Sequence, residues 1–142
     1  MTAFFTVLLL LAQPAPASLG QLRAESNPEH RARQAIEFAA MSERSAESSY
    51  SKGDMAAVKA ELQNMEKAVE IARDAFVQTG KTPQRHAGLY KSAELRTEEI
   101  LVRLGDLEKR MDADERSVVE EPRTKVQQIH DAWFEGIMGK KR

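Results

Sequence analysis

The sequence predicts an all-α fold, an antiparallel up-down four-helix bundle built from long helical hairpins. Hydrophobic residues recur at helical spacing over long stretches, and the intervening Gly and Pro residues fall where such helices would end. No stretch alternates polar residues with β-branched ones, so no strand is predicted. At 142 residues, the chain is long enough for one domain with a hydrophobic core.

The chain begins with a segment typical of export signals. An uncharged apolar run from Ala3 to Ala12 precedes the small-residue pattern Ala15-Pro16-Ala17, which predicts a signal peptide over 1–17 with cleavage after Ala17. The run is about half the roughly 20 residues of a transmembrane helix, so we expect a periplasmic or secreted protein with no stable membrane span. The remainder divides into a flexible N-terminal tail (18–26), the helical bundle domain (27–139) and a basic C-terminal tail (140–142).

The first helix of the bundle is predicted from Pro28 to about Lys52. Asn27 is a favourable N-cap, Pro28 suits the first helical position, and Gly53 is a typical C-terminal stop. Its predicted inner face consists of small residues with a single isoleucine: Ala32, Ala35, Ile36, Ala39, Ser42, Ala46 and Ser49. Small side chains allow close backbone approach, so we expect this helix to pack tightly against the next one.

The second helix is predicted from Met55 to about Gln78, with Asp54 as its N-cap and Gly80 after its end. Its apolar residues alternate steps of three and four: Met55, Val58, Leu62, Met65, Val69, Ala72 and Phe76. This spacing defines a single hydrophobic seam along the helix.

The third helix is predicted from Pro83, with Thr82 as its cap, to about Met111. Its seam is Tyr90, Ala93, Thr97, Ile100, Leu104, Leu107 and Met111, widened by Leu89, Leu101 and Val102. A stripe of this width is typical of a bundle helix. The fourth helix is predicted to start after Asp112 or Asp114, to be kinked or split at Pro122, and to end near Gly136 to Gly139.

The first hairpin resembles the turn of a tetratricopeptide repeat over about twenty residues, in which Gly53-Asp54 joins two packed helices flanked by Ala46 and Tyr50. Both predicted helices are longer than those of that repeat, and no second copy follows about 34 residues later. No peptide-binding groove is therefore inferred from the resemblance.

Composition excludes several functional classes. Lys and Arg total 21 against 22 Asp and Glu, which gives a net charge of −1 and no basic surface for nucleic acid. With no cysteine, the chain has no disulfide, thiolate nucleophile, iron–sulfur cluster or covalently attached haem. The sequence contains no phosphate-binding loop, nucleophile elbow or calcium loop, so we expect no enzymatic activity and no catalytic residue.

Metal and cofactor motifs are also lacking. The three histidines, His30, His86 and His130, do not form a pair four residues apart, and none follows a glutamate by three residues as in di-iron bundles. The acidic spacings Glu94–Glu98 and Glu66–Glu70–Asp74 are interpreted as a solvated surface. No metal site and no cofactor are predicted.

His130 supports an alternative function, a haem- or metal-binding bundle. It lies in the most aromatic segment after the signal peptide, and in outline such a protein resembles the soluble cytochrome b family, in which a methionine often ligates haem opposite the histidine. Methionines that could take this position are Met41, Met55, Met65 and Met111.

The main functional prediction is a structural or protein-interaction module that binds a partner protein or a second copy of itself through helical faces. Its predicted contact residues are Trp133, Phe134, Ile137 and Met138. A further alternative is an envelope holdase that protects unfolded clients. The sequence does not separate this alternative from the main prediction.

Overall fold

The computed structural model describes residues 18–139, which form helices and, within that range, no strand. The helices are α1 (Leu19–Ala24), α2 (Pro28–Ser51), α3 (Met55–Gln78), α4 (Ala87–Arg110) and α5 (Ala113–Met138). They pack against one another as an all-α helical bundle, which confirms the predicted fold class. The signal peptide predicted over 1–17 and the basic tail at 140–142 lie outside the described residues.

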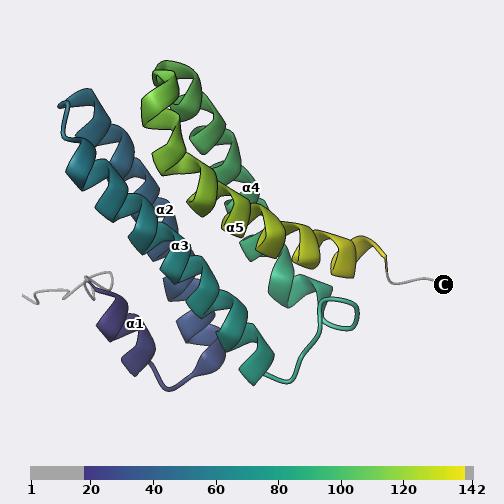
Figure 1. Ribbon diagram of the computed structural model, residues 1–142. Coiled ribbons are helices and arrows are strands. Elements are labelled where there is room, and N and C mark those ends of the chain that lie inside the picture. The colour runs from purple at the N-terminus through teal and green to yellow at the C-terminus, as the bar shows by residue number, and fades with distance from the viewer. Residues whose placement is uncertain (1–17, 140–142) are drawn as a thin grey trace, which may run out of the picture.

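The four long helices form two hairpins that lie side by side (Figure 1). Helices α2 and α3 make one hairpin and α4 and α5 the other, and both turns lie at the same end of the molecule. Helix α3 packs against α5, and α2 packs against α4. Successive helices therefore alternate in direction, whereas the contacts between hairpins join helices that run the same way.

The α2–α3 hairpin follows the sequence prediction closely. The Asn27 side chain accepts a hydrogen bond from the His30 amide, and Asp54 caps α3 by accepting one from the Ala57 amide. Gly53, at φ 74°, takes the left-handed conformation that the turn requires. All but one of the predicted inner-face residues of α2 are buried, and so are all but Met55 of the α3 seam.

Helix α4 begins at Ala87, four residues later than Pro83, where the sequence predicted it. Pro83 instead lies in a turn after Gly80, which has φ 71°, and His86 takes the N-cap position without a side-chain hydrogen bond. Pro83 contacts α5, where its Cγ would lie 2.4 Å from a Cβ placed on Gly136. Pro83 thus has a tertiary packing role, although it does not begin a helix.

Helix α5 is continuous through Pro122 and bends along its length (Figure 1). Asp112 and Glu115 form a capping box at its start. Because Pro122 has no amide hydrogen, the carbonyl of Val118 lacks its usual helical donor, and the helix bends without ending. The fourth bundle helix is thus kinked and not split.

A short helix, α1, occupies most of the predicted N-terminal tail. Ser18 caps it by accepting a hydrogen bond from the Gln21 amide, and Leu22 is fully buried where α1 packs against α2 and α3. Leu22 is the buried hydrophobic residue of this six-residue helix, and the partly buried Leu19 also packs against the core.

The bundle core ends in an aromatic cluster that joins α3, α4 and α5. The ring centroids of Phe76 and Tyr90 lie 4.4 Å apart, and Trp133 meets Phe76 edge-on at 5.4 Å. The Tyr90 hydroxyl donates a 2.7 Å hydrogen bond to the carbonyl of Lys81, and burial raises the pKa of this phenol. The cluster fixes the C-terminal half of α5 against α4 and against α3 of the other hairpin.

Candidate functional site

The C-terminal part of α5 divides the four predicted contact residues between two faces. Trp133 and Ile137 are only 5% and 8% exposed and belong to the core, whereas Phe134 and Met138 are 45% and 64% exposed. Each pair is four residues apart, and the two faces differ by one helical step of about 100°. Only Phe134 and Met138 are therefore accessible to a partner.

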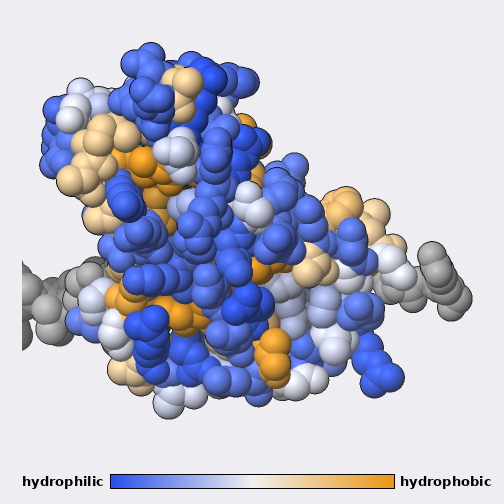
Figure 2. Space-filling view, viewed as in Figure 1, coloured by the Kyte–Doolittle hydropathy of each residue, from blue (hydrophilic) through white to orange (hydrophobic). Residues whose placement is uncertain are grey.

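This side of the molecule is mainly hydrophilic, and its hydrophobic side chains form several separate small groups, one of which lies over the C-terminal part of α5 (Figure 2). Other large hydrophobic side chains exposed among residues 18–139 are Met41, Val77, Leu95 and Val102. No helix in this range is both long enough and apolar enough to span a lipid bilayer.

His130 lies between α4 and α5, next to carboxylates that are distant in sequence. Its Nε2 atom is 3.3 Å from Oε1 of Glu94, and its Nδ1 atom is 3.2 Å from Oδ1 of Asp131. The imidazole ring also stacks on Phe134, with 6.1 Å between ring centroids. Glu98 completes this group, because ligand atoms of Glu94, Glu98 and His130 all lie within 4.8 Å of one another.

Burial differs among the members of this group. Glu94 is 2% exposed and His130 is 8% exposed, whereas Glu98 is exposed to solvent. Lys91 is 3.3 Å from the second carboxylate oxygen of Glu94. The immediate neighbours of His130 are thus acidic and aromatic. The other histidines, His30 and His86, are exposed near the starts of α2 and α4.

A groove of about 660 Å³ runs along the α4–α5 surface and opens onto this group. His130 and Glu98 line it together with Val102, Gly105 and Gln127. Arg123 also lines the groove and forms a 2.8 Å ion pair with Glu108. Solvent and small ions therefore have access to one side of the His130 ring.

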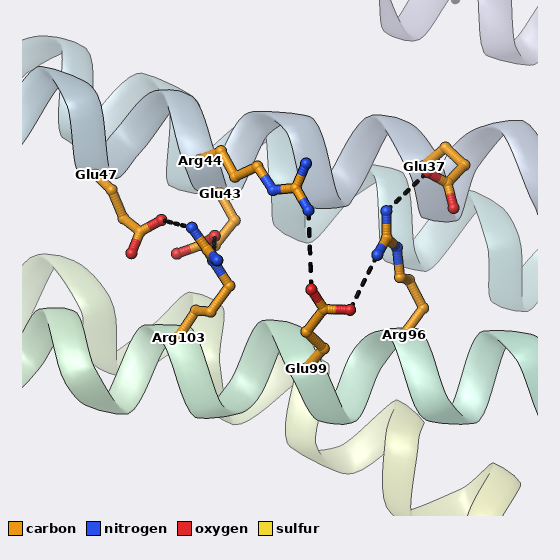
Figure 3. Close-up of polar contacts among 7 residues, drawn as sticks. All are labelled: Glu37, Glu43, Arg44, Glu47, Arg96, Glu99 and Arg103. Carbon is orange, nitrogen blue, oxygen red and sulfur yellow. Dashed lines mark hydrogen bonds and ion pairs between the residues drawn. The ribbon is translucent and has the colours of Figure 1, made fainter.

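A second polar feature, which we call the ion ladder, joins α2 to α4 (Figure 3). At one end Arg96 contacts Glu37 at 3.0 Å and Glu99 at 2.9 Å. At the other end Arg103 contacts Glu43 at 3.0 Å and also pairs with Glu47. The ladder consists of Glu37, Glu43, Arg44, Glu47, Arg96, Glu99 and Arg103.

Glu43 is the buried member of the ion ladder. Its side chain is fully buried, and its Oε1 atom has no hydrogen-bond partner among the described residues. Burial, together with the charge of Glu47, raises the pKa of Glu43 from 4.5 to about 7, although Arg103 opposes the shift. The ladder thus contains a carboxyl group that titrates near neutral pH.

The acidic residues Glu66 and Glu70 on α3 have lysines as neighbours and lie apart from the group around His130. Glu66 and Glu70 line a separate hollow with Lys59, Lys67 and Pro122. Partial burial, followed by the charges of Glu70 and Glu121, raises the pKa of Glu66. Lysines alternate with the carboxylates here, which fits the solvated surface that the sequence predicts.

Sequence reasoning identified His130 and noted the Glu94–Glu98 spacing, but did not place them together. His130 and Glu94 are 36 positions apart, so only the packing of α5 on α4 reveals the group. Glu43 was missed because its neighbours in sequence are polar, and its burial depends on α4. An acidic residue one step from the small-residue face of α2 was the available signal.

Comparisons with known proteins add no assignment: no protein family, curated protein or solved structure shows significant similarity to this chain.

Proposed function

We propose that the protein is an exported, non-enzymatic helical bundle that acts as a structural or protein-interaction module. Its contact surface, which we call the α5 patch, consists of Phe134 and Met138 and takes a partner protein or a second copy of the chain. The observation that supports this most directly is the exposure of both side chains, 45% and 64%, beside the buried Trp133 and Ile137.

The packing of α5 makes these two side chains suitable anchors. Trp133 is fixed against Phe76 and Tyr90, so the backbone that presents Phe134 and Met138 is already ordered. An ordered surface loses little conformational entropy on binding. Aromatic residues and methionine are also enriched in protein interfaces, where burial of apolar area contributes about 25 cal/mol per Å².

Export is proposed on sequence grounds. The apolar run and the Ala15-Pro16-Ala17 pattern are typical of a cleaved signal peptide. Cleavage after Ala17 would retain Ser18, the N-cap of α1, and all five helices. The periplasm or the extracellular space is therefore the proposed location.

The first test is the oligomeric state of a Phe134→Ala/Met138→Ala double variant, measured by sedimentation velocity over a range of concentrations. Self-association through the α5 patch predicts an oligomer for the wild type and a monomer for this variant, with unchanged far-UV circular dichroism. A Met41→Ala/Val77→Ala variant is the matched control, because it removes two hydrophobic side chains that are 48% and 73% exposed elsewhere.

A photo-crosslinking residue at position 134, introduced in the native host, tests for a partner of a different kind. The proposal predicts a defined adduct from position 134 and none from position 41, the control site on α2. A wild-type monomer that also gives no specific adduct from position 134 would refute the proposed contact surface.

A further inference from the structure

Three side chains that could hold a metal ion lie together between α4 and α5. Glu94 and Glu98 lie one turn apart on α4, and His130 faces them from α5. The distance of 3.3 Å from His130 Nε2 to Glu94 Oε1 is longer than a typical N–H···O hydrogen bond. It matches the separation of about 3.3 Å between neighbouring ligand atoms in a tetrahedral zinc site with bonds of about 2.0–2.1 Å.

We propose that Glu94, Glu98 and His130 bind a divalent first-row transition-metal ion of the zinc class. Two of the ligands, Glu94 and His130, are held in place by burial. The third, Glu98, is exposed and has no hydrogen-bond or ion-pair partner among residues 18–139, so its carboxylate is free to turn toward the ion.

The contacts of Asp131 support this assignment. Its Oδ1 atom lies 3.2 Å from His130 Nδ1 and also accepts a 2.7 Å hydrogen bond from the Gln127 side chain. With Nδ1–H donating to Asp131, the lone pair of Nε2 faces the Glu94 carboxylate. In that tautomer Nε2 and the Glu94 carboxylate both present lone pairs to a cation bound between them, and a carboxylate behind a metal-bound histidine is a common outer-shell partner.

The ligand types define the kind of ion. An imidazole nitrogen favours zinc and its neighbours, whereas calcium and magnesium prefer oxygen ligands only. Three protein ligands leave at least one coordination position, and the groove that Glu98 and His130 line supplies water to it. Lys91, which is 52% exposed and pairs with Glu94, has room to turn into solvent as the ion enters.

Calorimetric titration with zinc chloride tests the proposal. The untagged full-length chain is purified, treated with chelator and titrated, and we expect one ion per chain with micromolar or tighter affinity and a raised melting temperature. Millimolar magnesium should not displace zinc, because magnesium discriminates against the imidazole ligand.

Two ligand variants and two controls make the test specific. Glu98→Gln and His130→Gln should each weaken zinc binding at least about tenfold, since even outer-shell changes cost roughly 10–100-fold. His86→Gln and Glu120→Gln remove an exposed histidine and an exposed carboxylate elsewhere and should leave the affinity unchanged.

Glu98→Gln is the more informative of the two ligand variants. Glu98 is exposed and unpaired, so its substitution should not disturb folding. Wild-type protein that binds no zinc at micromolar concentrations would overturn the proposal. So would ligand variants that bind zinc as tightly as the wild type, or magnesium competing on equal terms. The α5 patch is unaffected by these outcomes, because its test uses other residues.

Discussion

Gly136 marks the closest approach between α5 and the α3–α4 connection. A Cβ atom at this position would lie 2.4 Å from Cγ and 2.9 Å from Cβ of Pro83, far inside contact distance. Because Pro83 is rigid, the backbone itself would have to move. The glycine therefore allows the C-terminal half of α5 to dock, although glycine is an unfavourable residue inside a helix.

Gly136→Ala should destabilise the protein by about 1–3 kcal/mol, because the overlap with Pro83 outweighs the helical preference for alanine. Urea unfolding measures the effect. Gly105→Ala is the matched control, since a Cβ there meets only the flexible Arg123 side chain at 3.6 Å. It should stabilise the protein by about 0.5–1 kcal/mol. Equal effects of the two substitutions would contradict the steric argument.

Glu43 gives the stability of the protein a defined pH dependence. Its pKa is raised from 4.5 to about 7, so between these values the folded state retains a proton that the unfolded state releases. The contribution of Glu43 to stability is therefore complete below about pH 4.5 and declines as the pH rises toward 7. Above that range both states are ionised, and the folded state holds a buried charge next to Glu47.

Glu43→Gln should remove this decline. Relative to the wild type, the variant should gain on the order of 1–3 kcal/mol of unfolding free energy between about pH 5 and about pH 8. Chemical denaturation in the presence of chelator measures the difference. Glu37→Gln is the control, because its side chain is 60% exposed in the same ladder. A wild type and a Glu43→Gln variant with parallel pH profiles would show that Glu43 ionises as an ordinary carboxyl.

At the level of single residues, helical spacing predicts burial correctly where apolar residues recur every three or four positions along one helix. Val58, Leu62 and Met65 are buried as their spacing on α3 predicts. The same reasoning does not reach Glu43 or Glu94, whose burial depends on α4 packing on α2 and on α5. Because both residues are charged, the sequence alone predicts that they are exposed. They are buried only because a neighbouring helix packs over them.

Among the helices, α1 shows how little sequence signal a docked element needs. It is six residues long, too short to persist alone, and its buried residue is a single leucine. Composition alone therefore predicts a tail for this segment. Its helical form depends on Leu22 entering the core between α2 and α3.

Leu22→Ala should cost about 2–5 kcal/mol of stability, because it leaves a cavity in the core. Thermal and urea unfolding report the loss. Leu19→Ala, in the same helix but only partly buried, should cost less and serves as the control. If both substitutions changed the stability by only a few tenths of a kcal/mol, α1 would be a tail in solution and its docking would be excluded.

Helix boundaries follow the sequence where capping is local, as at Asn27, Asp54 and Asp112. They depart from it where a residue has a tertiary role. Thr82-Pro83 has the pattern of a helix start, yet Pro83 packs against Gly136 of α5, and α4 begins at Ala87. Capping patterns alone do not separate these two uses of proline.

In the whole molecule, the order of helices around the bundle is the feature that sequence patterns leave open. Short turns fix the pairs α2–α3 and α4–α5, but either side of one hairpin could face the other. The ion ladder and the aromatic cluster specify the arrangement. Arg96 and Arg103 of α4 find their partners on α2, and Trp133 of α5 packs on Phe76 of α3.

Because these contacts join the hairpins through one continuous core, the protein should unfold as a single cooperative unit. Trp133 is the only tryptophan in the chain and reports on the junction of α3, α4 and α5, whereas far-UV circular dichroism reports on all helices. The two signals should give the same midpoint in urea. Trp133→Phe, unfolded in urea and followed by circular dichroism alone, is the control for any effect of the tryptophan side chain on stability. A fluorescence transition at lower urea than the loss of helicity would mean that the α4–α5 hairpin separates first, with α2 and α3 remaining as an independent pair.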